Sequence, residues 1–347
     1  MLKTNNLDAE IIVSDSSVDK SAFIAEKLGA KVVKHGKKGY GIAYLEGFKA
    51  AKGKYIFCAD ADGSYDFNEI PRFLFYLRKG YDFVIGNRRR IERGAMPFSH
   101  RYIGNPALSA ILNVFFGAGI KDAHCGMRAL TRKALDKLEL KTTGMEFASE
   151  MVIKAAKNKL KIKEISINYH RRIGKSKLRS FSDGWRHLRF MLMYAPDYLF
   201  IIPGAILLLL GILIMSLFLF GPVKIFGMVL YTHPMIIGSF LSTVGCQIIT
   251  LGIYAKTYAV SIGFEKTDRF VDLLARYLTF ESGMALGLGL VFISFILGFF
   301  ILFDWIVNGF PGMQRTNEMI LILTLSVLGV QTVFSSAFLS ILLVGKK

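Results

Sequence analysis

The chain has 347 residues, 52% of them apolar, and a formal net charge of +18 at pH 7. Because soluble domains are about 45–50% apolar, the composition indicates membrane segments and excludes disordered, collagen-like and small disulfide-scaffold proteins. Only eight of the 44 Lys and Arg and six of the 26 Asp and Glu lie in residues 198–347, so residues 1–197 carry a net charge of +16. The sequence therefore predicts a basic head followed by an apolar tail.

Strands and helices alternate along the first part of the head. Apolar runs predict strands at residues 9–14, 30–35, 54–62 and 81–88, with helices at 19–28, 40–51 and 68–79. This order is typical of a parallel α/β sheet, whose ligands bind at the carboxyl ends of the strands. Polar residues stand at these ends: Asp15, Asp60, Asp62, Asn87 and Arg88.

The sharpest local feature is Asp60-Ala61-Asp62, which closes the third predicted strand. Residues i and i+2 of a strand point to one face, so the two carboxylates are expected to converge. Adjacent carboxylates repel each other unless a cation lies between them. Mg²⁺ or Mn²⁺ bridging a diphosphate would satisfy both. A solvated corner between strand and loop is the alternative.

A basic, glycine-rich loop with Lys37, Lys38, Gly39 and Gly41 precedes the second predicted helix. Backbone N–H groups and the helix dipole favour a phosphate at such a place. A flexible surface turn explains the same residues equally well, so both interpretations stay open.

Two further helices are expected in the head. Residues 100–117 are apolar but too short to span a bilayer, so they form either an interfacial helix or a buried core helix. In residues 146–157, Glu146 and Glu150 share one face, which costs energy unless a cation or substrate lies between them. A surface salt bridge from Glu150 to Lys154 is the alternative.

A densely basic segment stands directly before the tail. Its compact Arg-x-Gly-x-Ser-Lys pattern, from Arg172 to Lys177, suits a phosphate clamp beside the bilayer. The alternative is a flank attracted to anionic lipid, worth about 1 kcal/mol per cation.

Four apolar runs in the tail are each long enough to cross a bilayer, which takes roughly 20 residues. They cover about 198–220, 235–260, 284–307 and 319–344. Lys and Arg gather before the first run, in the link 261–283 and at the C-terminus, which predicts that head and C-terminus are cytoplasmic. No charge lies at mid-span, so a proton-coupled transporter or an ion channel is not expected.

Five motifs occur in order along the head: DADGS, GNRRR, DAHCGMRAL, GMEFASE and RRIGKSK. Together they resemble the family 2 glycosyltransferases of the dolichol-phosphate mannose and glucose synthase group, over residues 9–197. A tail of four spans also occurs in that group. The resemblance implies an α/β GT-A (Rossmann-like) catalytic domain over residues 1–181, a juxtamembrane amphipathic helix over 182–197, and an all-α membrane domain of four transmembrane helices over 198–347.

The resemblance also implies a reaction: inverting transfer of a hexose from GDP-mannose or UDP-glucose to a polyprenyl or dolichyl phosphate at the cytoplasmic membrane face, for glycan assembly. Asp60 and Asp62 would bind Mg²⁺ or Mn²⁺. The other implied roles are nucleotide binding by Asp15, Lys38, Gly39 and Asp60, catalysis by Asp62, Arg88, Arg128 and Glu150, and acceptor-phosphate binding by Arg172, Ser176 and Lys177.

Two features depart from the family pattern. Ser64 stands where many relatives have Gln, so a third metal ligand is not assumed there. The family opens with a strand and a Pro-x-x-Asn-Glu loop, whereas this sequence opens with MLKTNNLDAE. We therefore expect the chain as written to lack its first strand and to be inactive or nearly so.

Other functions compete with transfer to a lipid phosphate. A processive polysaccharide synthase joins the same kind of head to membrane spans, but its Gln-x-x-Arg-Trp motif does not follow Gln247, Gln314 or Gln331. A membrane scaffold or flippase partner with a degenerate head is the leading alternative. The positive charge gathers beside the membrane and no nucleic-acid recognition motif occurs, so no nucleic acid is expected as a partner. The expected partners are a nucleotide sugar, a lipid phosphate and the bilayer.

Overall fold

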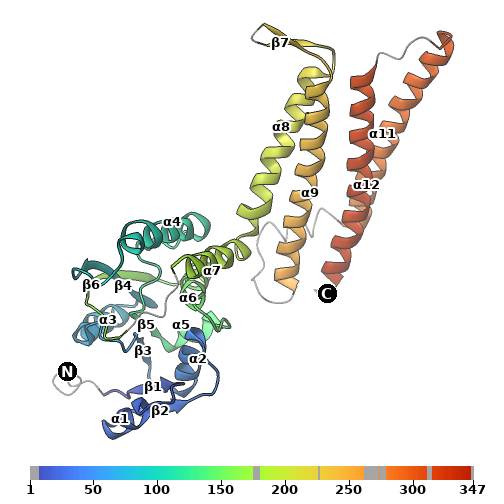
Figure 1. Ribbon diagram of the computed structural model, residues 1–347. Coiled ribbons are helices and arrows are strands. Elements are labelled where there is room, and N and C mark those ends of the chain that lie inside the picture. The colour runs from blue at the N-terminus through green and yellow to red at the C-terminus, as the bar shows by residue number, and fades with distance from the viewer. Residues whose placement is uncertain are drawn as a thin grey trace. The chain divides into compact units, whose positions relative to one another are not determined.

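The computed structural model describes residues 8–174, 180–225, 227–261, 273, 279–310 and 315–344. The chain divides into two compact units, Met1–Tyr194 and Ala195–Lys347 (Figure 1). Ser176 and Lys177 lie outside the described residues, and so does the start of the chain, on which the expectation of a missing first strand falls.

The first unit alternates strands and helices, as the apolar runs predict. Its strands are β1 (Ile12–Asp15), β2 (Lys31–Lys34), β3 (Tyr55–Cys58), β4 (Phe83–Ile91), β5 (Arg128–Thr131) and β6 (Ile162–Tyr169). Its helices are α1 (Ser21–Lys27), α2 (Tyr40–Ala50), α3 (Ile70–Arg78), α4 (Asn105–Phe116), α5 (Arg132–Leu138), α6 (Phe147–Lys157) and α7 (Ser180–Met193). A 3₁₀ turn, Phe67–Glu69, leads into α3, and a π-helix, His100–Gly104, leads into α4.

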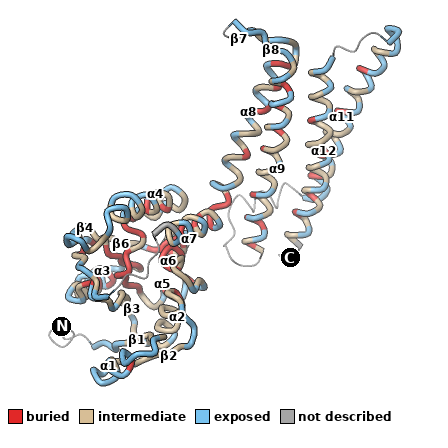
Figure 2. The backbone as a smooth tube through the Cα atoms, in the orientation of Figure 1, coloured by how far each residue is buried: buried red, intermediate tan, exposed pale blue. Residues whose placement is uncertain are grey.

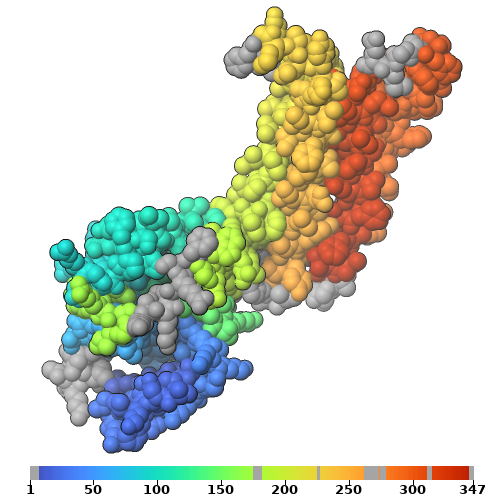
Figure 3. All heavy atoms as spheres, in the orientation of Figure 1, coloured from blue at the N-terminus to red at the C-terminus, as the bar shows by residue number. Residues whose placement is uncertain are grey.

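The strands of this unit form two sheets. β1 pairs in parallel with β2, and the other strands are ordered β3-β5-β4-β6. The segment with β1, α1 and β2 is a lobe coloured blue in Figure 3. β5 is antiparallel to both of its neighbours, so the expected parallel sheet is a mixed one. The register shows this: Arg128, the first residue of β5, is opposite Ile85, and Leu130 is opposite Phe83, so β5 runs back toward the beginning of β4.

The core of the first unit surrounds the four-stranded sheet, where red segments gather in Figure 2. Phe83, Val84 and Ile85 of β4 are fully buried, as is Leu130 of β5. Phe73 of α3 is buried against them, because α3 packs on β4 and β5. Burial of this kind, at roughly 25 cal/mol per Å² of apolar surface, stabilises the sheet whose strand ends carry the candidate site.

The second unit contains the expected spans. Four helices are long and apolar enough to cross a membrane, over Asp197–Phe218, His233–Ser261, Phe280–Val307 and Thr316–Leu343. Their elements are a π-helix, Asp197–Ile201, continued by α8 (Ile202–Phe218), then α9 (His233–Ser261), α11 (Phe280–Val307) and α12 (Thr316–Val344). A short hairpin, β7 (Val223–Ile225) and β8 (Met228–Leu230), joins α8 to α9.

Small residues bring these helices together. α8 packs on α9, α11 on α12, and α9 on α12. A Cβ at Gly287 of α11 would lie 2.7 Å from the carbonyl oxygen of Gly329 in α12, so only glycine permits this approach. Ser239 of α9 and Thr324 of α12 share a hydrogen bond of 2.7 Å. Close backbone packing and interhelical hydrogen bonds usually associate helices in lipid, because apolar side chains there are already out of water and gain no further hydrophobic free energy by packing together.

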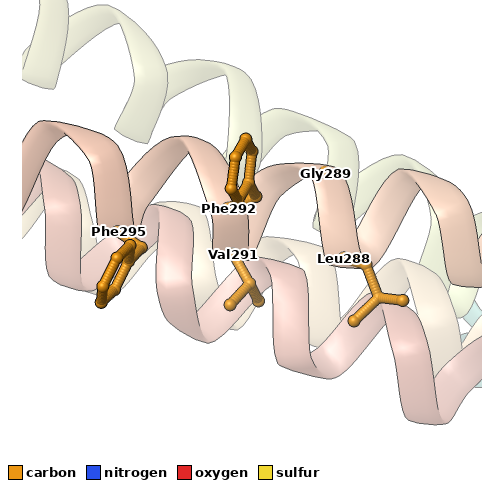
Figure 4. Close-up of a pocket in the computed structure, with 5 residues that line it drawn as sticks. All are labelled: Leu288, Gly289, Val291, Phe292 and Phe295. Atoms are coloured by element: carbon orange, nitrogen blue, oxygen red, sulfur yellow. The ribbon is translucent and has the colours of Figure 1, made fainter.

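One hollow lies on α11, around Gly289, with Leu288, Val291, Phe292 and Phe295 beside it (Figure 4). Its lining is entirely apolar, so it has no group that could bind a diphosphate. The residues that the sequence motifs mark as candidates for the chemistry lie in the first unit.

Candidate active site

Asp60 lies just beyond the carboxyl end of β3. The Tyr44 hydroxyl of α2 donates a hydrogen bond to it, with 3.0 Å between Tyr44 Oη and Asp60 Oδ1. A Cβ at Gly126 would lie 2.7 Å from Asp60 Oδ2, so glycine makes room for this carboxylate. Burial raises the pKa of Asp60, and the Tyr44 hydrogen bond offsets that rise only in part. A half-buried carboxylate of this kind is a place that a cation would stabilise.

Asp62 has a different environment. It accepts hydrogen bonds from the backbone N–H (3.0 Å) and the hydroxyl of Ser64, while its other oxygen pairs with the Arg172 guanidinium. Gly63 has φ +77°, a conformation that permits the tight turn between Asp62 and Ser64. Partial burial raises the pKa of Asp62, but the Ser64 and Arg172 contacts outweigh it and hold the pKa below its ordinary value.

The two aspartates lie in a loop and not on one face of a strand, because β3 ends at Cys58. The chain then leaves β3 and meets the end of β6. Tyr65 forms a bridge with Tyr169, and the His170 N–H donates to the Ser64 carbonyl oxygen over 2.9 Å. This crossing brings the DADGS motif to residues 171–174, the described part of the RRIGKSK motif.

Arg88 and Asp122 form a buried ion pair. Arg88 Nε and Nη2 donate to the two Asp122 oxygens over 2.7 Å each, and the Arg88 backbone N–H donates over 3.0 Å. Both side chains are only 10% exposed. Burial raises the pKa of Asp122, but the Arg88 guanidinium outweighs it and lowers the pKa. This bidentate pair fixes the second half of β4 against the loop that follows α4.

Arg128 organises that same loop from β5. Its guanidinium donates to the carbonyl oxygens of Cys125 (2.8 Å), Ala148 (2.9 Å) and Ala123 (2.9 Å). Arg128 is only 3% exposed, so its charge is held inside the protein near Asp60, whose pKa it lowers. The structure thus places Arg128 beside the site as a support for the 123–125 backbone.

Glu150 has a comparable role on α6. Its fully buried carboxylate accepts hydrogen bonds from the N–H groups of Lys141 (3.0 Å) and Thr142 (2.9 Å) and from the Thr142 hydroxyl (2.6 Å), and it pairs with Lys154 at 2.7 Å. The Glu150–Lys154 pair that the sequence offered as an alternative therefore exists, but it is buried instead of solvated.

The glycine-rich loop packs on the segment that Glu150 holds. Gly39 and Gly41 lie so close to the carbonyl oxygens of Thr143 and Thr142 that neither position has room for a Cβ. The Ile42 N–H donates to the Thr143 carbonyl oxygen over 3.3 Å. Close backbone packing therefore accounts for both glycines, and Lys38 is exposed beside them.

Asp15 ends β1 in the other sheet. Its carboxylate accepts hydrogen bonds from the backbone N–H and the hydroxyl of Ser17, each over 3.0 Å. It organises the turn after β1 and contacts none of the residues around Asp60 by a hydrogen bond that the described part of the chain contains. Its role in nucleotide binding stays a prediction.

Comparisons with known proteins identify the family of the chain. Residues 2–139 match the family described as Glycosyl transferase family 2, and residues 253–343 match the Glycosyltransferase family 2 C-terminal transmembrane region. The low-salt glycan biosynthesis hexosyltransferase Agl6 of Haloferax volcanii is 38% identical over 341 residues, which are 97% of this chain and 82% of that protein. The chain is a family 2 glycosyltransferase.

Two further similarities are narrower. The dolichyl-phosphate hexose transferase of Haloferax volcanii is 35% identical to the glycosyltransferase over 179 residues, 51% of this chain and 76% of that protein. A solved structure of glucosyl-3-phosphoglycerate synthase from Mycobacterium tuberculosis aligns with 55% of this chain and 69% of its own, at 20% identity and a TM-score of 0.43.

The carboxylates of Asp60 and Asp62 in the glycosyltransferase are suitable ligands for a divalent ion that the substrate diphosphate also binds. Asp60 offers a half-buried carboxylate, and Asp62 would contribute once it releases Arg172. In the described ranges no group of three His, Cys, Asp or Glu side chains is placed to hold a metal. Mg²⁺ typically keeps several waters and binds through one or two carboxylates plus substrate phosphates, so two aspartates suffice.

The sequence patterns missed two contributors to the site of the glycosyltransferase. Tyr44 supplies the hydrogen bond to Asp60, and the Tyr65 hydroxyl accepts the Gly126 N–H over 2.7 Å. Tyr40 and Tyr44 stand four residues apart on α2, a spacing that places both on one helix face and could have indicated Tyr44.

Proposed function

We propose that this glycosyltransferase transfers a hexose from a nucleotide sugar, GDP-mannose or UDP-glucose, to a polyprenyl or dolichyl phosphate at the cytoplasmic membrane face. The observation that best supports this proposal is the ion pair between Asp62 and Arg172. Asp62 belongs to the pair that suits a metal and a diphosphate, whereas Arg172 opens the basic segment before the first span. Donor and acceptor groups are therefore adjacent on the protein.

The relatives support this choice of acceptor and pathway. One is a dolichyl-phosphate hexose transferase, and another, aligned over 97% of the chain, is a hexosyltransferase of glycan biosynthesis. The four apolar helices and the transmembrane family match support an acceptor that is dissolved in the bilayer around the enzyme.

The chemistry needs no general base from the protein. A phosphate monoester has a second pKa near 6 and is mostly dianionic at neutral pH, so the nucleophile is already charged. One phosphate oxygen forms the new bond to the anomeric carbon as the bond from that carbon to the nucleoside diphosphate breaks. Attack on the face opposite the leaving group inverts the configuration.

The protein's task is to align the two anions and to compensate their charge. Asp60 and Asp62 would hold Mg²⁺ or Mn²⁺, which supplies charge to the departing diphosphate when bound. Arg172 would hold the acceptor phosphate, together with Ser176 and Lys177. Arg88, Arg128 and Glu150 keep the surrounding loops in place through the contacts described above.

The decisive experiment is sugar transfer by the full chain in liposomes. Purified protein is incubated with labelled GDP-mannose or UDP-glucose, Mg²⁺ or Mn²⁺, and a polyprenyl phosphate, and the lipid is then extracted. Label in the lipid that requires the phosphate on the polyprenol supports the proposal. Label released only as free sugar contradicts it.

A further inference from the structure

Three side chains outside the proposed donor and acceptor groups, two of them buried and His124 half-buried, are joined in one series of hydrogen bonds. Ser149 Oγ lies 3.1 Å from His124 Nε2 and 2.8 Å from His187 Nδ1. The two imidazole rings meet edge to face, with centroids 4.4 Å apart. Ser149 is fully buried and His187 is 7% exposed. A polar chain of this kind is costly to bury unless its members satisfy each other.

The three residues come from three different places in the first unit. His124 belongs to the loop whose flanking residues are fixed by Arg88 and Arg128, which bind the Asp122 side chain and the carbonyl oxygens of Ala123 and Cys125. Ser149 lies in the first turn of α6, and His187 lies in the middle of α7. These hydrogen bonds therefore connect the loop beside Asp60 to the helix that precedes the first span.

The position of α7 matters because of what stands before it. Arg172 pairs with Asp62, and the Ile173 N–H donates to the Asp62 carbonyl oxygen over 2.7 Å. α7 begins at Ser180, a few residues later in the sequence. The basic segment is thus anchored on Asp62 at one side and followed by a helix anchored through His187 at the other.

We propose that His124, Ser149 and His187 are positioning residues that hold α7 against the Asp122–Arg128 loop and thereby fix how the acceptor phosphate approaches Arg172. This inference rests on the proposed function, since it assigns the chain to the acceptor side of that reaction. Neither histidine transfers a proton in it, because the acceptor phosphate is already ionised.

The two histidines use different nitrogens, which makes a sharp test possible. His187 bonds through Nδ1, whose position an Asn amide reproduces, while His124 bonds through Nε2, whose position a Gln amide reproduces. We expect His187→Asn and His124→Gln to retain the acceptor KM within about threefold. His187→Gln, His124→Asn and Ser149→Ala should raise it roughly 10- to 100-fold, the change in an equilibrium constant that the loss of one buried hydrogen bond corresponds to. The donor KM should change little in all five.

Lys157→Met is the matched control. Lys157 at the end of α6 also holds the chain near α7, by donating to the Tyr194 carbonyl oxygen over 2.9 Å, but this bond lies just past the C-terminal end of α7, seven residues beyond His187. If Lys157→Met raises the acceptor KM as much as Ser149→Ala, general loosening of α7 explains the effect and the proposal is wrong. The proposal is equally wrong if Asn and Gln act alike at both histidine positions, or if donor and acceptor KM rise together.

Hydrogen exchange of the full chain separates this inference from the proposed function. Ser149→Ala should speed amide exchange both in α7 and in residues 122–128, whereas Lys157→Met should speed it only near the end of α7. Should the wild-type chain transfer no sugar to polyprenyl phosphate, this exchange pattern still tests the link between helix and loop. Unchanged exchange in residues 122–128 of Ser149→Ala would overturn it.

Discussion

Asp62 pairs with Arg172 although 110 residues separate them in the sequence. The pair compensates a carboxylate in a site where Asp60, two residues away, forms no ion pair with any residue that the structure describes. Asp62 therefore keeps a low pKa while burial raises the pKa of Asp60. Two neighbouring carboxylates with pKa values pushed apart are a common sign of a working site.

Asp62→Asn should abolish transfer while the protein stays folded. The change removes the charge that would face both the metal ion and Arg172, and loss of one such electrostatic group costs roughly 10²–10³ in kcat. Asp66→Asn is the matched control, since Asp66 is a nearby acid that only caps the turn before α3 through the Asn68 N–H, at 2.9 Å. Full activity of Asp62→Asn under saturating Mg²⁺ would remove Asp62 from the mechanism.

Arg172→Ala should raise the KM for the lipid phosphate by roughly tenfold or more, because a charge-assisted hydrogen bond to phosphate is worth about 1.5–3 kcal/mol. Arg171→Ala serves as its neighbour control: Arg171 Nε donates to the Arg93 carbonyl oxygen over 2.8 Å and contacts neither aspartate of the site. Initial rates against acceptor concentration measure both. Equal effects of the two substitutions would show that Arg172 contributes only to the general positive charge of the basic segment.

Asp60→Asn should remove the response of the protein to divalent ions. Wild-type protein should unfold at a higher temperature in Mn²⁺ with a nucleoside diphosphate than in the diphosphate alone, since a ligand that binds only the folded state stabilises it by about 2.7 kcal/mol at a hundred times its Kd. Without metal, the asparagine variant should be at least as stable as wild type, because it no longer buries a charge. Equal shifts of Tm by Mn²⁺ in both proteins would exclude Asp60 as a ligand.

Glu150→Ala should lower the free energy of unfolding by about 3–5 kcal/mol, as expected when one partner of a buried ion pair is removed. The substitution leaves Lys154 and the Lys141 and Thr142 donors without their acceptor. Urea unfolding of the purified protein gives the value. A variant with an unchanged urea midpoint and a strongly reduced kcat would instead place Glu150 at the sugar.

The stability of the first unit should rise with pH between about 4 and 6.5. Burial lowers the pKa of His187 to about 4, and Arg128 adds to this, while Asp183 and Glu146 oppose it. An unfolded histidine titrates near 6.5, so in this window the unfolded state binds more protons than the folded one. His124, lowered by burial and by His187, Arg128 and Arg88, acts in the same direction.

His187→Asn should flatten this dependence, because asparagine does not titrate. One histidine shifted this far accounts for about 3 kcal/mol across the window. Urea midpoints at pH 4.5, 5.5 and 7 measure the slope in both proteins. Parallel slopes would show that His187 is protonated equally in the folded and unfolded states.

Local patterns in the sequence were enough for the spans and for most elements of the head. A membrane helix satisfies its own backbone within one continuous segment, so length and hydropathy alone mark it. The strands ending near Asp15 and Cys58 were likewise marked by apolar runs bounded by polar turns. Short motifs were enough to predict the acid pair, the basic segment and the family, because each motif is a run of neighbouring residues.

Only the tertiary structure decided what those motifs do to one another. The antiparallel direction of β5 and the pairing of Asp62 with Arg172 depend on contacts between segments far apart in the sequence, up to 110 residues for this pair. The roles of Arg128 and Glu150 likewise depend on contacts with other segments and with loops that show no periodic pattern. The two aspartates lie in a loop instead of on the expected strand face, because β3 ends at Cys58 and the chain turns toward β6. A residue's type fixes which bonds it can form, but its partner depends on which loops the packed sheet brings within about 3 Å of it.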